Sequence, residues 1–400
     1  MQITGKRYGT GKLISLEIVG TCIKSVSDPM RESAAGQVWL SPGLVDLQIN
    51  GFNGIDFADP SFDLPQAIEV TQQLSRTGIT QYLPTITTNS AAGLQTSMRK
   101  LAKAFAESPE FAAQAVGIHL EGPYISPEDG PRGAHPKQHC RPPNWDEFAE
   151  LQKLSGNRIR LVTLSPEYET SVQFIRQAVK QDVNVAIGHT NANSQQIADA
   201  VSAGASLSTH LGNGAHSLIR RHPNYIWDQL ANDELYASVI ADGHHLPPSV
   251  VKSFVRAKKK KRVILVSDLT WLAGKPPGVY GNTVLGDVEV LESGKLVVAG
   301  QRDYLAGATT PLINCVGLAA EFADIDLATA IKMASLHAQK MMGWPRTKFK
   351  AGNRADLMLY RLNETASPAH RLELLATICA GKTVYRNPQH AELVAEAIST

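Results

Sequence analysis

The sequence predicts an α/β protein whose main body is a (β/α)8 barrel of the TIM type. Through most of the chain, short apolar segments alternate with longer segments of helical periodicity, which is typical of βαβ units and a parallel sheet. About eight such repeats fit into roughly 300 residues, which suits a barrel of this kind. No GxGxxG motif follows the first strand, so a dinucleotide-binding sheet is disfavoured.

The two ends of the chain differ from its centre. Residues 1–41 carry short alternating runs rich in β-branched residues and glycine, such as KLISLEIVG and GQVWLSPG, which predict β-strands. Residues 345–400 contain the similar runs ADLMLY and LELLATICAGKTVYRN. We expect the two ends to pair into one small β-sandwich domain, with the barrel of residues 42–344 inserted within it.

Strands and helices alternate regularly between the two ends. The expected strands are PGLVDLQI, QYLPTITTN, AVGIHLEG, IRLVTLSPE, VNVAIGHT, ASLSTHLG, LYASVIADG and RVILVSDLT. Segments of helical pattern separate them, among them FDLPQAIEVTQQLSRTG, GLQTSMRKLAKAFAES, SVQFIRQAVKQ and SQQIADAVSAG. Residues 278–304 interrupt this order with turn chemistry around Gly294, so we expect a hairpin insertion near the last strands.

The composition is that of an ordinary globular protein. Of 400 residues, 43% are hydrophobic and 19% charged, and the net charge of +2 gives no global indication of nucleic-acid binding. We interpret the one basic run, RAKKKKR at 256–262, as a solvated helix end. The four cysteines form no CxxC motif, the N-terminus lacks the apolar run of a signal peptide, and no apolar stretch reaches the ~18 residues of a membrane span. We therefore expect a cytoplasmic protein that binds neither nucleic acid nor membrane.

Polar residues with ligand or acid–base chemistry recur where the expected strands end, which is where barrels collect catalytic groups. They are Gln48, Asn50, Glu121, His189, His210, Asp242, His244, His245 and Asp268. Packing in the core does not explain why six expected strands all end in residues of this kind. A buried cluster of carboxylates and imidazoles needs a cation between its members. One Glu with two His is a common catalytic zinc set, which leaves one position open for water.

Motifs along nearly the whole chain resemble the N-acetylglucosamine-6-phosphate deacetylase family, within the amidohydrolase superfamily. They occur in family order as PGLVDLQINGFNGIDF, GIHLEGPYISPEDGPRGAHP, AIGHTNA, STHLGNGAH, IADGHHL, VSDLTWLAG and AGNRADLMLY. The resemblance implies metal-dependent hydrolysis of the acetamide of N-acetylglucosamine 6-phosphate to glucosamine 6-phosphate and acetate.

The family pattern implies roles for five of these residues. Glu121 of HLEGP, His189 of GHT and His210 of STH would be the metal ligands. Asp268 would act as base and then as acid, and His135 would polarise the acetamide carbonyl.

The same pattern places the substrate-binding residues in two loops. Asn213 and Gly214 resemble the sugar or phosphate contact region, and His245 resembles a second substrate contact. In the family an arginine binds the phosphate, sometimes across a dimer interface. Arg221 is the best positional match, with Arg220 beside it, so we expect a homodimer.

Many amidohydrolases carry His-x-His at the first strand and bind two metals. This chain has Gln48 and Asn50 there, and neutral amides are poor ligands for a transition metal. Some deacetylases of the family share this substitution and use one metal. We therefore expect one divalent metal ion, with zinc as the expected metal.

The chain also departs from the family around the presumed sugar site. GNGAHSLIRRHPNYIW is an unusual sequence after His210, His244 is an additional histidine, and Leu269 and Trp271 are bulky residues close to Asp268. The substrate therefore stays open. One alternative is an amidohydrolase that acts on another N-acyl amino sugar or amide, and a less favoured one is a non-catalytic assembly protein.

Three further features have local interpretations. The loop SPEDGPRGAHPKQHCRPP, residues 126–143, is expected to form an active-site lid. His119 either orients Glu121 or is an ordinary core histidine. His337 lies in a helical pattern and is expected to serve packing.

Overall fold

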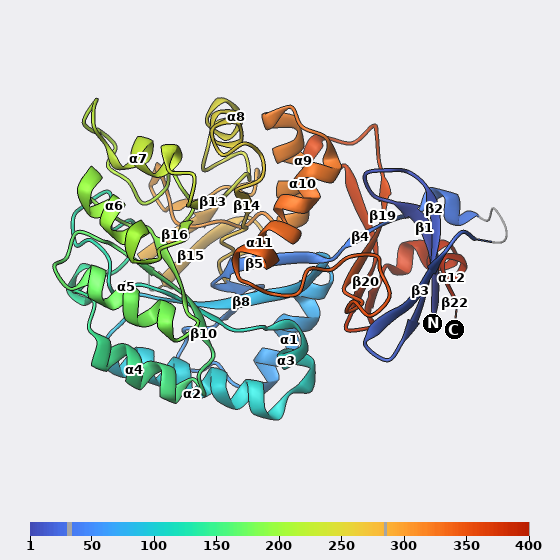
Figure 1. Cartoon of the computed structure of the whole chain (residues 1–400), viewed down its shortest axis with the longest axis horizontal. Helices are drawn as coiled ribbons and strands as arrows, with labels where there is room; N and C mark the ends of the chain where they lie inside the picture. The colour runs from blue at the N-terminus through green and yellow to red at the C-terminus, as the bar shows by residue number, and fades with distance from the viewer. Residues whose placement is uncertain (30–33, 284–285, 400) are drawn as a thin grey trace.

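The computed structural model describes residues 1–29, 34–283 and 286–399 (Figure 1). It confirms the expected barrel. Within these residues, eight parallel strands form one sheet in the order β14-β13-β12-β11-β10-β9-β8-β5, so neighbours in the sheet follow one another in the sequence. The strands are β5 (Leu44–Ile49), β8 (Ile79–Thr87), β9 (Ile118–Glu121), β10 (Ile159–Leu164), β11 (Asn184–Ile187), β12 (Leu207–Ser208), β13 (Tyr236–Val239) and β14 (Val263–Leu265).

The first and last barrel strands meet at their carboxyl ends. Ile49, the last residue of β5, forms a parallel bridge with Leu269, which follows β14. The backbone N–H of Asn50 donates to the carbonyl of Leu269 at 2.8 Å. Leu269, which we expected close to the sugar site, is fully buried in the core because it makes this closure.

Helices cover the outside of the barrel (Figure 1). They are α1 (Leu64–Ser75), α2 (Ala91–Glu107), α3 (Pro109–Gln114), α4 (Trp145–Leu154), α5 (Ser171–Lys180), α6 (Ser194–Ala203), α7 (Tyr225–Ala231), α8 (Pro248–Ala257), α9 (Leu312–Ala323), α10 (Leu327–Met333) and α11 (Leu336–Met341). Local sequence fixes some of their limits. Helix α6 starts at a capping box made by Asn193 and Gln196, and it ends at Gly204, whose φ of 115° suits glycine. Among the described helices, none is both long and apolar enough to cross a membrane.

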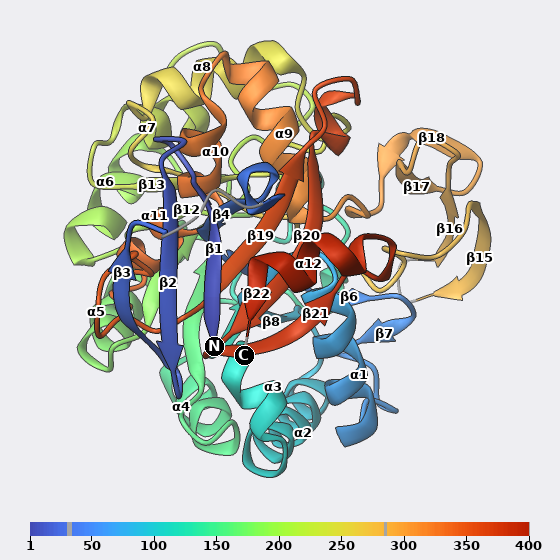
Figure 2. The ribbon, with the colours of Figure 1, turned by 90° about the vertical axis from the view of Figure 1, so that its right-hand side faces the viewer.

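Both chain ends contribute to a second sheet, which lies to one side of the barrel (Figures 1 and 2). Its strands are hydrogen-bonded into one continuous mixed sheet in the order β21-β20-β19-β4-β1-β2-β3, and β22 pairs with β1. They are β1 (Gln2–Arg7), β2 (Leu13–Val19), β3 (Cys22–Ser27), β4 (Trp39–Pro42), β19 (Leu357–Leu362), β20 (Leu372–Cys379), β21 (Lys382–Arg386) and β22 (Ile398–Ser399). Helix α12 (Ala391–Ala397) contributes Val394 and Ala397 to its hydrophobic core.

The insertion after β14 is larger than the hairpin that we expected. Its described residues form a four-stranded antiparallel sheet, which projects from the barrel in Figure 2. The strands are β15 (Gly278–Thr283), β16 (Gly286–Val290), β17 (Leu296–Val298) and β18 (Gln301–Leu305). Trp271 packs on the apolar cluster of this sheet, with its ring edge-on to that of Tyr280 at 6.3 Å. Its side chain therefore helps to anchor the insertion.

The basic run after α8 contains one residue that is not solvated. Lys258 is only 2% exposed, so our interpretation of the run is wrong at this position. Its ammonium donates to the carbonyls of Gln229, Asn232 and Leu235 at 2.6–3.0 Å. These carbonyls lie at and just beyond the end of α7, where helical acceptors lack partners, so Lys258 satisfies them.

Candidate active site

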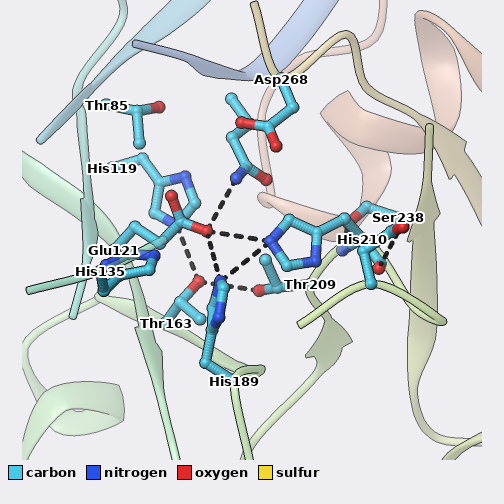
Figure 3. Close-up of polar contacts among 12 residues, drawn as sticks. Thr85, His119, Glu121, His135, Thr163, His189, Thr209, His210, Ser238 and Asp268 are labelled. Atoms are coloured by element: carbon cyan, nitrogen blue, oxygen red, sulfur yellow. Dashed lines mark hydrogen bonds and ion pairs between the residues drawn. The ribbon is translucent and has the colours of Figure 1, made fainter. Parts of the chain in front are cut away.

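Three ligand-type side chains converge at the carboxyl ends of β9, β11 and β12 (Figure 3). The ligand atoms of Glu121, His189 and His210 all lie within 4.8 Å of one another. The Nε2 atoms of His189 and His210 lie 3.1 and 3.0 Å from Oε1 of Glu121, and 3.1 Å from each other. All three residues are buried. The sequence-predicted ligand set is thus brought together by the barrel.

The donor set suits a divalent cation. Nδ1 of His189 donates to the carbonyl of Pro131 at 2.8 Å, and this bond orients the ring so that Nε2 faces Glu121 and His210. Burial works to raise the pKa of Glu121, but the hydrogen bonds from His189 and His210 outweigh it and hold the pKa well below its usual range. A carboxylate and two imidazoles facing one another in a buried site are stabilised by a metal ion.

The two amides at the end of β5 point donors at this site. Gln48 Nε2 donates to Oε1 of Glu121 at 2.9 Å, the same oxygen that faces both imidazoles. Asn50 Nδ2 donates to Oδ1 of Asp268 at 2.8 Å. Each amide therefore presents an N–H to a carboxylate, where a histidine ligand would present a lone pair.

Asp268 lies beside this cluster, within electrostatic range of Glu121 and His210. Burial raises its pKa to about 6, the charge of Glu121 adds to the increase, and the hydrogen bond from Asn50 opposes it. Asn50 Oδ1 is itself a buried atom without a hydrogen-bond partner among the described residues. A buried carboxyl with a pKa near neutrality is suited to acid–base work.

His135 reaches the same site from the loop after β9. Its ring lies edge-on to the His189 ring at 4.4 Å, and burial lowers its pKa to about 3, so the ring is neutral. Nδ1 of His135 lies 2.8 Å from the hydroxyl of Thr88, which directly follows β8. Sequence reasoning missed Thr88, although the strand-end rule that found the other residues applies to it equally.

Of the expected substrate-binding residues, three lie beside the metal-ligand candidates or Asp268, and the fourth, Arg221, lies at the surface. Gly214 packs so closely on His189 that a Cβ would lie 2.7 Å from Nδ1, and Asn213 donates to the His210 carbonyl. His245 lies in the loop after β13 and is bonded to Asp242, and its charge is felt at Asp268. Arg221 is exposed, and its guanidinium has no partner in the part of the chain that the structure describes.

Arg220, the alternative to Arg221, lies in a different environment. It lines a cavity of about 290 Å³ together with His216 and Tyr225. This cavity opens beside the loops that follow β11 and β12, and the three metal-ligand candidates are not among its lining residues.

Sequence reasoning also missed a polar network that ties the expected lid to the barrel. Glu128 accepts hydrogen bonds from Asn191 at 2.9 and 3.0 Å, and Nε2 of His216 lies 3.4 Å from the same carboxylate. The backbone N–H of His216 donates to the hydroxyl of Tyr225 at 2.9 Å, and Nδ1 of the same histidine lies 3.0 Å from that hydroxyl. Scattered polar residues in loops carry no periodic pattern, so their meeting could not be anticipated.

Two other histidines lie outside the ligand cluster. His119 bonds to the carbonyl of Leu47 and to the hydroxyl of Thr163, at 3.1 and 2.8 Å, and makes no hydrogen bond to Glu121 (Figure 3). His337 is bonded through Nδ1 to the carbonyl of Val263. Both contacts join neighbouring elements of the barrel.

Comparisons with known proteins agree with this geometry. The model of the amidohydrolase family matches residues 39–384. N-acetylgalactosamine-6-phosphate deacetylase of Escherichia coli O157:H7 is 32% identical over 322 residues, which is 80% of this chain and 82% of that protein. N-acetylglucosamine-6-phosphate deacetylase of Bacillus subtilis (strain 168) is 31% identical over 355 residues, 86% of this chain and 84% of that protein.

Solved structures extend the likeness to three dimensions. N-acetyl-D-glucosamine-6-phosphate deacetylase of Mycobacterium smegmatis superposes with a TM-score of 0.84 at 26% identity, covering 96% of this chain and 100% of that one. A mutant of that enzyme in complex with N-acetyl-D-glucosamine-6-phosphate gives a TM-score of 0.83 at 26% identity, covering 96% and 99%. The matched length and the buried ligand cluster lead to one conclusion: this chain is a metal-dependent amidohydrolase and belongs to the N-acetylglucosamine-6-phosphate deacetylase family.

Proposed function

We propose that this enzyme hydrolyses the acetamide of N-acetylglucosamine 6-phosphate to glucosamine 6-phosphate and acetate, with one zinc ion held by Glu121, His189 and His210. The observation that carries the proposal is the buried cluster of one carboxylate and two imidazoles with Asp268 beside it. Glu and His side chains in a three-ligand site are typical of catalytic zinc. Relatives named as deacetylases of this substrate support the reaction.

A bound divalent ion supplies Lewis-acid polarisation of the carbonyl and lowers the pKa of a water molecule. The side chains of this chain do the rest. Asp268 accepts the proton of the attacking water and returns it to the departing amine, with its carboxylate held by Asn50. The neutral ring of His135 accepts at Nδ1 from the Thr88 hydroxyl and donates from Nε2 to the acetamide oxygen. Asn213, Gly214 and His245 hold the sugar.

The phosphate needs a cation, because a buried dianion without a partner is unfavourable. Arginine binds phosphate through two parallel N–H donors and keeps its charge. We assign this role to Arg221, which is exposed and has no partner of its own in the described chain, and we propose that it serves a second copy in a homodimer. We place the enzyme in the cytoplasm, and its four free cysteines are consistent with a reducing compartment.

A second candidate substrate is N-acetylgalactosamine 6-phosphate, favoured by the relative of that name at 32% identity. The two sugars differ only in the configuration of one hydroxyl. We assign this discrimination to the loop GNGAHSLIRRHPNYIW, which departs from the family sequence and starts two residues after the ligand His210.

Acetate release from the purified enzyme tests both candidates. The substrates are the two 6-phosphates and plain N-acetylglucosamine, and metal content is measured by elemental analysis on the same sample. We expect the highest kcat/KM on N-acetylglucosamine 6-phosphate and one zinc per chain. A preference for the galactosamine compound would favour the second candidate. Equal activity on the plain sugar would support a broader amidohydrolase, no acetate from any substrate would support an assembly protein, and two tightly held metals would overturn the single-metal site.

A further inference from the structure

A carboxylate–imidazole pair lies in the loop after β13, outside the ligand cluster. Oδ2 of Asp242 lies 2.7 Å from Nδ1 of His245, and Oδ1 accepts the backbone N–H groups of His244 and His245 at 2.8 and 2.9 Å. The side chains of Asp242 and His245 are 2% and 7% exposed. Asp242 thus fixes both the backbone of this loop and one of its two imidazoles.

The charge of Asp242 is well defined. Burial works to raise the pKa of Asp242, but the hydrogen bond and charge of His245, with the two backbone donors, bring it down to about 2. Asp242 is therefore an anion that only accepts hydrogen bonds, so Nδ1 of His245 carries a proton. Nε2 of His245 has no hydrogen-bond partner in the described residues.

The imidazole of His245 lies close enough to Asp268 to influence it. Burial raises the pKa of Asp268, and the charge of His245 is among the influences that lower it, so the two groups lie within electrostatic range. His244 has the same backbone contact to Asp242, but its ring makes no hydrogen bond among the described residues. The two adjacent histidines therefore share the backbone bond to Asp242 and differ in the bond from the ring to its carboxylate.

We propose that Asp242 is a positioning residue for substrate recognition, which acts by holding His245 with its proton on Nδ1 and its Nε2 directed toward an anionic or oxygen-rich group of the substrate. Nε2 donates to an anion when it carries a proton and accepts from a hydroxyl when it does not, and in both cases Asp242 holds the ring through Nδ1. The inference rests on the proposed amino-sugar phosphate substrate and deepens it, because it names the group that holds a substrate-binding imidazole in place.

A purely structural role for Asp242 has to be separated from this one. Because Oδ1 accepts two backbone N–H groups, an alanine would leave both without a partner and would disturb the loop. Asp242→Asn keeps an oxygen for these donors. Its amide removes the negative charge and turns an N–H toward the ring, so Nδ1 must become an acceptor and the proton moves to Nε2.

Steady-state kinetics of Asp242→Asn, His245→Gln and the double variant test the proposal, with His244→Gln as the matched control. We expect Asp242→Asn to raise KM for N-acetylglucosamine 6-phosphate about tenfold or more, as loss of a charge-assisted contact does, and to change kcat by less than about threefold. The double variant should be no worse than His245→Gln alone, because one residue acts through the other. Additive losses in the double variant, or a fall in kcat with unchanged KM, would assign Asp242 a structural role instead. His244→Gln should behave as the unmodified enzyme.

A second readout needs no turnover. In ¹⁵N-labelled enzyme, the Nδ1–H of His245 should give a hydrogen-bonded proton signal that disappears in Asp242→Asn and in His245→Gln, and titration with inorganic phosphate should shift the His245 ring signals. If the signal behaves so but no amino-sugar phosphate is hydrolysed, the proposed function fails while the arrangement of the pair holds. If the unmodified enzyme lacks the Nδ1–H signal, or phosphate shifts the ring equally in Asp242→Asn, the positioning role is wrong.

Discussion

Three residues at the reaction centre have backbone conformations that are uncommon for side-chain-bearing residues. The φ angles of His189, His210 and Asp268 are 52°, 25° and 53°. Residues in this left-handed region are held there by the surrounding structure, and they cluster at functional sites. Each lies two or three residues beyond the end of a barrel strand, so the turn carries the side chain across the mouth of the barrel toward the others (Figure 3).

The first prediction concerns the base. Asp268→Asn keeps the shape of the side chain and an oxygen for the Asn50 donor, but the amide cannot accept a proton from water. Turnover should fall on the order of 10²-fold or more, the contribution of a general acid–base group. The metal content should stay the same, because Asp268 is not one of the three proposed ligands. Activity and elemental analysis on one preparation measure both.

A matched control is available for this substitution. Asp324 also has a left-handed backbone, with φ of 55°, but its side chain is 79% exposed. Asp324→Asn should leave turnover unchanged. Near-normal turnover in Asp268→Asn would move the base to another residue, and a loss of metal would make Asp268 a ligand.

The sequence could predict residues whose chemistry coincides with a strand end. Glu121, His189 and His210 each stand at or just beyond the end of an expected strand, and the barrel brings them together as that rule requires. The sequence could not predict hydrogen-bond partners that do not lie at a strand end. Pro131 contributes only a backbone carbonyl to His189, and any residue could supply one.

At the scale of elements, the loop of residues 126–143 is bound closely to the site. The carbonyl of Pro131 accepts from His189, and Glu128 bonds to Asn191 in the loop after β11. A Cβ at Gly130, whose φ is 97°, would lie 2.9 Å from Cα of His216. The expected lid is therefore held by one metal-ligand candidate and by two neighbouring loops.

The second prediction follows from these contacts. Glu128→Ala removes the acceptor of Asn191 and the partner of His216. Each lost hydrogen bond contributes about 0.5–1.5 kcal/mol, so the amides of residues 126–143 should exchange with solvent about 2–10-fold faster. Hydrogen exchange followed by mass spectrometry measures this loop separately from the rest.

Asp129→Ala is the control in the same loop. Its ion pair with Arg132 lies at the surface, where Asp129 is 79% exposed, and such pairs contribute little. Exchange in this variant should stay close to that of the unmodified enzyme. Equal acceleration in both variants would mean that the Glu128 network does not hold the loop.

The positions of elements were easier to predict than their number or pairing. Short segments rich in apolar residues marked the barrel strands, because strands of a parallel sheet are buried on both faces. The insertion at 278–304 was predicted as a hairpin because only the turn at Gly294 was evident, whereas three connections separate its described strands. Lys258 was misjudged because a basic run does not reveal which ammonium meets three helix-end carbonyls.

At the scale of the whole molecule, the chain begins and ends in one sheet, and the barrel lies between these segments. Strand β1 pairs with β22, so the first and last described strands are neighbours (Figure 2). Similar composition at the two ends allowed this pairing to be predicted. The register and strand order could not be, because they depend on contacts between residues more than 300 positions apart in the sequence.

The third prediction concerns the association of copies of the chain. The loop after His210 ends in exposed residues: Leu218 is 91% exposed and Ile219 41%, and Arg221 has no partner in the described chain. An apolar tip with a free cation is suited to contact a second copy, in which Arg221 would meet the phosphate. Arg221→Ala should raise KM for the phosphorylated substrate about tenfold or more, as loss of a bidentate contact does, with little change for the plain sugar. Arg256→Ala, an exposed arginine at the end of α8, is the control and should change neither.

Mixing two impaired variants decides whether Arg221 acts within its own chain or in the partner. A mixed dimer of Arg221→Ala with Asp268→Asn contains one complete site if the arginine crosses the interface, because one copy supplies the base and the other the arginine. With random pairing of subunits in a two-fold dimer, about a quarter of all sites would then be complete. Activity at subsaturating substrate should recover toward that fraction after the variants are unfolded and refolded together, and not when they are mixed without exchange.

If Arg221→Ala raises KM but the mixture recovers nothing, Arg221 serves its own chain. An unchanged KM would make the loop a solvated segment and would assign the phosphate to a different cationic residue.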